Sequence, residues 1–254
     1  MSATTRTAAA LHPAAMQLSL LRGFEVRRNG VVVSLPPSSQ RLVAFLALHD
    51  RSLRRSYVSG TLWLDSSDAR ANANLRSALW RISGPSGDRL VAASSTHVRL
   101  DPEVVVDFHR TYQRARAIVD AADPALVADL SELDDFADDL LPDWYEDWIV
   151  VERERFRQVR LRALDRLAEH LVSGARYGDA LKVALAAVRT EPLRESAHRQ
   201  AIRAHLGEGN IGEAVRQYRT YAALLGREIG AKPSPAMEAL IAPVGHRVAG
   251  ARPS

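Results

Sequence analysis

The chain has 254 residues, a formal net charge of +4 and no cysteine. The lack of cysteine excludes a disulfide framework and a thiolate metal site, and no apolar run approaches the roughly 18 residues that a membrane span needs. The length suffices for one large domain or two ordinary ones.

The charge is divided unevenly along the chain. Residues 1–100 carry 13 Arg against 5 acidic residues, whereas residues 101–150 carry 3 Arg against 14 acidic residues. This asymmetry predicts a first module that binds a polyanion and a second module of another kind. Residues 1–16 are rich in Ala and Thr and lack an apolar signal core, so we expect a disordered tail there.

The first predicted elements are strands and helices in a compact order. Residues 17–35 contain β-branched runs around Asn29-Gly30, a dipeptide that accepts the positive φ angles of a hairpin turn. After two prolines, Ser38 or Ser39 can cap a helix that reaches about residue 49. A short helix over residues 56–64 follows.

The third predicted helix covers residues 69–82, and its two sides differ in chemistry. Its apolar residues recur at steps of three and four, namely Ala71, Leu75, Ala78, Leu79 and Ile82. We place the polar residues on the opposite face, with Arg76 and Trp80 at its flanks; they are Arg70, Asn72, Asn74, Ser77 and Arg81.

No acidic residue lies between Asp68 and Asp88. Arginine and amide side chains without a competing carboxylate suit a helix in the DNA major groove, where Arg pairs with guanine and Asn with adenine. A basic, solvated helix face explains the same stretch, and both readings stay open at this point.

A hairpin closes the first module. Residues 90–93 and 97–100 flank a turn over residues 94–96, so the order is sheet, three helices, hairpin. This order predicts an α+β winged helix-turn-helix and resembles the DNA-binding domain of OmpR-type regulators, over residues 17–102. Thr96 and Arg99 would then lie near a phosphate or the minor groove, although for Arg99 an ordinary strand-face charge is the favoured explanation.

The second module, residues 103–250, is expected to be all-helical. Helical spacing predicts helices over residues 107–121, 123–133 and 148–172. The acidic stretch over residues 134–147 is interrupted by aromatic residues, which favours a packed turn over a disordered tail.

A repeat appears after residue 174. Tyr177-Gly-Asp-Ala180 matches Ile211-Gly-Glu-Ala214, which lies 34 residues later, the period of tetratricopeptide repeats. Two copies cannot form a solenoid alone, so the helices over residues 107–172 must complete the bundle. A helix over residues 235–248 could cap its end.

Several sequence patterns resemble motifs of cofactor-binding, metal-binding or catalytic sites. Gly207 to Gly212 matches GxGxxG, but a dinucleotide site needs a preceding strand, and here the glycines fall at the turn of the repeat. His198 and His205 have no third ligand arranged beside them, so we expect no metal. With no phosphate-binding loop and no arrangement of Ser, His and acid for acyl transfer, we expect no cofactor and no enzyme.

The second module also resembles the bacterial transcriptional activator domain. The motifs that carry this resemblance are Trp144-Tyr-Glu-Asp-Trp148, Glu152-Arg-Glu-Arg-Phe156, Ala163-Leu164, the stretch 174–181, the stretch 191–198, Gly209-Asn210, Gln217-Tyr218 and the stretch 225–235. Joined to an OmpR-like winged helix, it is similar to the actinobacterial antibiotic regulatory proteins (SARP type), over residues 17–245. The resemblance implies a short member, with no nucleotide-binding domain after Ser254.

This resemblance implies a cytoplasmic transcriptional activator. Such proteins bind tandem direct repeats of double-stranded DNA near promoters, as a homodimer on DNA, and recruit RNA polymerase through sigma and other subunits. The chain departs from the family at Ala78 and Trp80, where relatives often carry Arg, and Trp80 could instead pack against the sheet.

A second class of function stays open on the sequence. The chain could be a helical-repeat adaptor or signalling protein whose basic N-terminal module binds a partner other than DNA.

Overall fold

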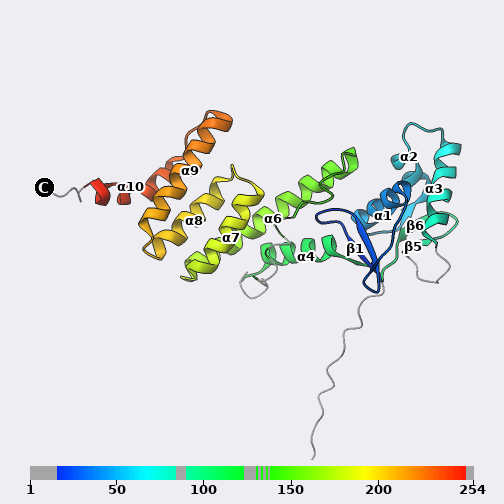
Figure 1. Cartoon of the computed structure of the whole chain (residues 1–254), viewed down its shortest axis with the longest axis horizontal. Helices are drawn as coiled ribbons and strands as arrows, with labels where there is room; N and C mark the ends of the chain where they lie inside the picture. The colour runs from blue at the N-terminus through cyan, green and yellow to red at the C-terminus, as the bar shows by residue number, and fades with distance from the viewer. Residues whose placement is uncertain are drawn as a thin grey trace, which may run out of the picture. The chain divides into compact units, whose positions relative to one another are not determined.

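We describe the fold from a computed structural model of the chain, over residues 16–83, 90–122, 130, 133, 136 and 138–249. The chain divides into two compact units (Figure 1). One unit runs to Phe108 and includes Leu141–Asp143; the other comprises His109–Leu140 and the chain from Trp144 onward. Most of the expected tail and most of the helix expected over residues 123–133 lie outside the described residues.

The first unit combines small sheets with three helices. Its elements are β1 (Met16–Ser19), β2 (Glu25–Arg28), β3 (Val31–Val32), α1 (Pro37–His49), β4 (Leu53–Arg54), α2 (Arg55–Leu62), α3 (Asp68–Ile82), β5 (Val91–Ala93), β6 (His97–Leu100) and β7 (Val105–Val106). One sheet has the order β3-β2-β1-β7, in which only the β1–β7 pair is parallel. The other has the order β4-β6-β5 and is antiparallel.

The expected order of sheet, three helices and hairpin is confirmed. Strands β4 and β7 were not expected, because a strand of two residues is too short to give an alternating pattern. Met16, which we assigned to the tail, is buried and begins β1. The hairpin turn between β2 and β3 is also confirmed, since Asn29 and Gly30 have φ angles of 48° and 80°.

The start of helix α1 differs from the prediction. Pro36 is the N-cap, Pro37 is the first helical residue, and no side chain caps the helix. The fixed φ of proline suits this position, where a backbone N–H would have no partner in the helix. Ser39, expected as a possible cap, is instead buried, and its hydroxyl donates to the carbonyl of Ala78 at 3.2 Å.

Residues distant in sequence complete the first unit. Asp107 accepts hydrogen bonds from the backbone N–H groups of Leu20 at 2.8 Å and Leu21 at 3.2 Å. The N–H of Leu141 donates to the carbonyl of Leu20 at 2.9 Å. The turn after β1 therefore receives its partners from two later segments, which local sequence patterns do not reveal.

The second unit is built from helices. They are α4 (Asp107–Asp120), which begins in the first unit, α6 (Asp147–Ser173), α7 (Tyr177–Thr190), α8 (Glu195–Gly207), α9 (Ile211–Ile229) and α10 (Pro235–Ala249). Each helix from α6 to α9 contacts the next along the chain, and α10 contacts both α8 and α9. This is a tetratricopeptide-like arrangement, and the expected terminal helix is confirmed. No helix in the described part of the chain is long and apolar enough to cross a membrane.

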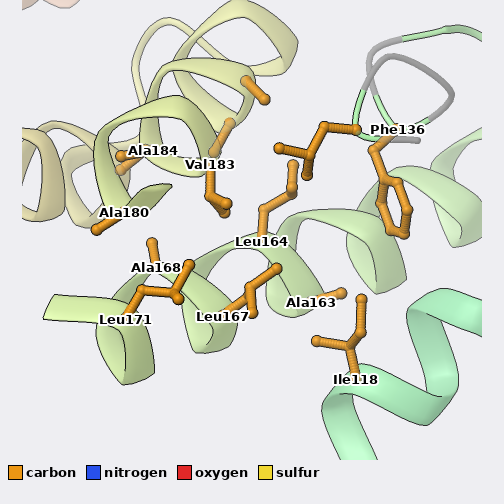
Figure 2. Close-up of a cluster of buried hydrophobic side chains, with 14 of the residues drawn as sticks. Ile118, Phe136, Ala163, Leu164, Leu167, Ala168, Leu171, Ala180, Val183 and Ala184 are labelled. Atoms are coloured by element: carbon orange, nitrogen blue, oxygen red, sulfur yellow. The ribbon is translucent and has the colours of Figure 1, made fainter. Parts of the chain in front are cut away.

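Small residues at the repeat positions allow close helix packing. Ala180, Ala184 and Ala187 of α7 are at most 1% exposed and pack within one cluster. Figure 2 shows part of this cluster, where Ile118 of α4 lies near Leu167 and Ala163 of α6. The prediction that earlier helices complete the bundle is therefore confirmed.

The acidic segment before α6 is packed where the structure describes it. The buried guanidinium of Arg160 donates to the carboxylate of Asp139 at 2.6 Å and also bonds the carbonyl of Asp138. The same guanidinium lies 5.2 Å from the ring centre of Phe156. This agrees with the expected packed turn, but Arg160 itself was not foreseen as its anchor.

Candidate nucleic-acid interface

Helix α3 is held in the first unit by its apolar side. Its inward residues are at most 9% exposed, namely Ala71, Leu75, Ala78 and Ile82. Helix α3 contacts α2 and α1, and the bond from Ser39 fixes it to α1 at the Ala78 carbonyl. The predicted inward side is confirmed, except that Leu79 is only half-buried.

The opposite side of α3 is exposed, but its centre differs from the prediction. Helical spacing aligns one exposed stripe opposite the buried residues, made of Ala69, Ala73, Arg76, Ser77 and Trp80. Arg76 and Trp80, which we placed at the flanks, are therefore central. Asn72 and Asn74 are half-buried at the edges, and Arg70 and Arg81 are exposed.

Trp80 is one of the most exposed apolar side chains in the described residues. Its exposed fraction is 78%. The alternative that Trp80 packs against the sheet is therefore wrong. Arg76 precedes Trp80 by one turn and lies on the same stripe, whereas Arg81, the next residue, lies about 100° further around the helix and borders the stripe.

Asn72 is engaged within the protein. Its Nδ2 donates to the carbonyl of Asp68 at 2.9 Å, and its Oδ1 accepts from the hydroxyl of Ser59 at 3.2 Å. Ser59 is buried in α2, so this amide links α3 to α2. Reading an adenine uses both polar atoms of an asparagine, so Asn72 would first have to release these bonds.

The arginines of α3 have no anionic partner in the part of the chain that the structure describes. Within the described residues, Arg70, Arg76 and Arg81 form no ion pair and no side-chain hydrogen bond. Asp68 is the one acidic residue of the helix, and it lies in the first turn, where a negative charge suits the helix dipole. The outward face of α3 is thus cationic and available to an anionic ligand.

The β5–β6 hairpin presents the other two candidate residues. Thr96 and Arg99 are both exposed, and the Thr96 hydroxyl lies 2.9 Å from Nδ1 of His97. A shallow hollow of about 250 Å³ is lined by residues of this hairpin, Arg99 included, and by Ser52.

Arg55 was missed as a residue that positions this hairpin. Its backbone N–H donates to the carbonyl of Thr96 at 2.9 Å, and its Nη1 donates to the carbonyl of Ser94 at 3.1 Å. The first residue of α2 thus holds the hairpin tip. The basic stretch over residues 51–55 marked a charged loop, but nothing in it signals these tertiary bonds.

The glycines of the GxGxxG pattern at residues 207–212 are explained by packing and backbone conformation at the turn of the repeat. Helix α8 ends at Gly207 and α9 begins at Ile211, so the predicted turn of the repeat is confirmed. A Cβ at Gly207 would lie 2.3 Å from the ring of Tyr177, closer than any real contact. Gly209 has a φ of 78°, which favours glycine.

His198 is a buried residue of the helical unit. It is 2% exposed, and its Nε2 lies 2.9 Å from the carbonyl of Pro192, while its Nδ1 lies 2.8 Å from Nε2 of Gln217. A neutral ring that donates from Nε2 and accepts at Nδ1 satisfies both partners. Burial lowers the pKa of His198. Among the described residues, no three His, Asp or Glu side chains gather as metal ligands.

Comparisons with known proteins agree with the architecture. Residues 105–244 match the family model of the bacterial transcriptional activator domain. The solved structure of Mycobacterium tuberculosis EmbR, in complex with a low-affinity phosphopeptide, has a similar fold, with a TM-score of 0.71 and 20% sequence identity. The match covers 92% of this chain and 65% of the EmbR chain, so this chain spans about two thirds of that length. No curated protein sequence matches.

Proposed function

The chain belongs to the bacterial transcriptional activator domain family, as a regulator of the antibiotic regulatory protein type, and from this premise we propose that it binds promoter DNA sequence-specifically and activates transcription. That family is a class of transcriptional regulators and not a class of enzymes. The cytoplasm, where promoter DNA and polymerase meet, is the proposed location.

One observation carries the DNA-binding part of the proposal. The exposed face of α3 bears Arg70, Arg76 and Arg81, none of which has an anionic partner among the described residues. Unpaired guanidinium groups on an exposed helix are suited to phosphates and to guanine edges. The other face of α3 is fixed by the core, so binding requires no rearrangement of the helix.

The arrangement around α3 supports a winged helix-turn-helix. In this assignment α3 enters the major groove, and the β5–β6 hairpin is the wing, with Thr96 and Arg99 near the DNA backbone. Asn74, Ser77 and Trp80 complete the contacts proposed for α3. Asn72 contributes only if its bonds to Asp68 and Ser59 open.

The helical unit is assigned to protein contacts. By family membership, it would contact RNA polymerase, through sigma and other subunits, and would pair two copies on tandem direct repeats. A directly repeated site requires a head-to-tail arrangement of two copies and not a two-fold symmetric one.

The proposal is tested by selecting duplexes from a random pool with the full chain. We expect a directly repeated sequence, with an affinity that falls by about 0.9 log units per log unit of salt for each phosphate contacted. Added polymerase should then transcribe more from a promoter that carries this site. If no duplex is enriched over the starting pool, the proposal is wrong and the adaptor function is favoured.

A further inference from the structure

Trp80 lies at the centre of the exposed stripe of α3, and most of the other residues of this stripe are small. Ala69, Ala73 and Ser77 of that stripe are small, so the backbone of α3 can approach a ligand closely. Trp80 is the large apolar side chain of this face and is 78% exposed. It therefore projects from a helix that can lie deep against its ligand.

Charge complementarity indicates what that ligand is. Arg76 lies one turn before Trp80 on the same stripe, Arg81 borders the stripe, and neither has an ionic partner among the described residues. One guanidinium group beside the indole and a second at the edge of the stripe favour a polyanion over a second protein surface. The inference rests on the proposed function, in which this polyanion is duplex DNA.

The chemistry of the indole then selects the group that it meets. Indole has one N–H donor, no acceptor and a broad apolar face. In the major groove, the bases present hydrogen-bonding groups together with one apolar group, the C5-methyl of thymine. We propose that Trp80 is a specificity-determining residue that reads a thymine by packing its indole on this methyl group.

Replacing thymine by deoxyuridine tests this contact, because deoxyuridine lacks only the C5-methyl. Duplexes selected by the full chain are prepared with each thymine replaced in turn. We expect one position in each half-site at which the replacement weakens binding about fourfold, the value of one methyl-sized group removed from water. Replacements elsewhere should leave the affinity unchanged.

The Trp80→Ala variant links this loss to the side chain. It should bind the thymine duplex at least as weakly as wild type binds the deoxyuridine duplex, because it loses the whole indole, and the deoxyuridine replacement should then have no further effect. This non-additivity identifies a direct contact. Trp80→Phe, which keeps an apolar ring, should retain part of the sensitivity to deoxyuridine.

Leu64→Ala is the matched control. Leu64 is also 78% exposed, in the same unit, but lies outside α3. Its removal should leave the sensitivity to deoxyuridine intact. Because both side chains are exposed, both variants should melt at the wild-type temperature, which is measured by circular dichroism.

Two results would overturn the inference while leaving DNA binding in place. One is equal binding of wild type to thymine and deoxyuridine duplexes. The other is a Trp80→Ala variant that binds weakly yet keeps the sensitivity to deoxyuridine, as expected if the indole contacted the backbone, wedged between base steps or met a second copy. A selection that enriches no duplex would overturn the proposed function as well.

Discussion

Helices α3 and α6 are both rich in arginine, but they use it in opposite ways. On α3, Arg76 and Arg81 extend into solvent without a partner among the described residues. On α6, Arg153 donates to the backbone carbonyls of Leu140 at 2.9 Å and Trp144 at 3.0 Å, thereby fixing the turn before the helix. The comparison teaches that the groups within reach of an arginine, and not the arginine content of a helix, separate a structural helix from a binding helix.

The acidic residues of α6 explain part of this contrast. Arg157 donates to Glu154 at 2.8 Å and also pairs with Glu191. Hydrogen bonds from Arg157 and Gln158 lower the pKa of Glu154 to about 2. Helix α3 has a single acid, Asp68, at its start, so its cations remain available to an external anion.

The largest expected effect is a loss of stability on replacing Arg160, an arginine of α6 with a structural role. Arg160→Ala removes the partner of the Asp138 carbonyl and of Asp139, and it leaves a gap beside Phe156. Because Asp139 is 56% exposed, the loss comes from the unsatisfied Asp138 carbonyl, which costs about 1–3 kcal/mol, and from the lost packing of the buried Arg160 side chain, which adds to it. We expect a loss of this size in the free energy of unfolding, measured by urea denaturation, with unchanged DNA affinity of the folded protein.

Arg155→Ala is the control for that change. Arg155 lies on the same helix, is largely exposed and pairs with Glu152 at 3.7 Å. A surface pair of this kind contributes about 0–1 kcal/mol. If the two variants lose equal stability, the structural role given to Arg160 is incorrect.

On the other side of the comparison, Arg76→Ala and Arg81→Ala should weaken DNA binding and leave stability unchanged. Removing a residue that reads a base should cost about 1–3 kcal/mol in binding free energy. Removing a phosphate contact should instead reduce the slope of log affinity against log salt by about one. Affinity is measured by fluorescence anisotropy over a range of salt concentrations.

Arg27→Ala controls for the loss of charge itself. It removes the same charge from the first unit, but Arg27 is paired with Glu25 at 2.6 Å. This variant should bind DNA nearly as wild type does. Wild-type affinity in both α3 variants would contradict the assignment of α3 to the groove.

The smallest expected effect is a pH dependence confined to the helical unit. Burial lowers the pKa of His198 below the ordinary value of about 6.5, although the Pro192 carbonyl and Glu195 oppose the shift. The unfolded chain therefore binds a proton at this residue at a higher pH than the folded chain. The stabilisation is complete above about pH 6.5 and is lost as the pH falls below it.

His198→Asn sharpens this assignment. The variant should be less stable at pH 7.5, because the contact of His198 with the Tyr221 ring at 4.4 Å is lost. Its unfolding free energy should depend less steeply on pH between 6.5 and 5 than that of wild type. Parallel curves for the two proteins would show that another group causes the dependence.

Local patterns predicted most of the elements because their signals lie within a few residues. The 3.6-residue period located α3, the Asn29-Gly30 turn located a hairpin, and the 34-residue spacing located the repeat. Strand β7 and the Asp107 bonds to the turn after β1 were missed because their partners lie far earlier in the chain: β7 pairs with β1 (Gln17 with Val105), and Asp107 is 87 and 86 residues from Leu20 and Leu21. Only the folded chain brings such groups together.

The sequence alone defined which residues α3 offers, because the order of apolar and polar side chains around a helix follows from its period. It also defined the small residues that let α7 pack closely. The tertiary structure decided which of the α3 side chains are engaged: Ser59 of α2 bonds Asn72, whereas no described residue pairs with Arg76 or Arg81. That outcome depends on which side chains α2 brings against α3, and helical periodicity does not contain this information.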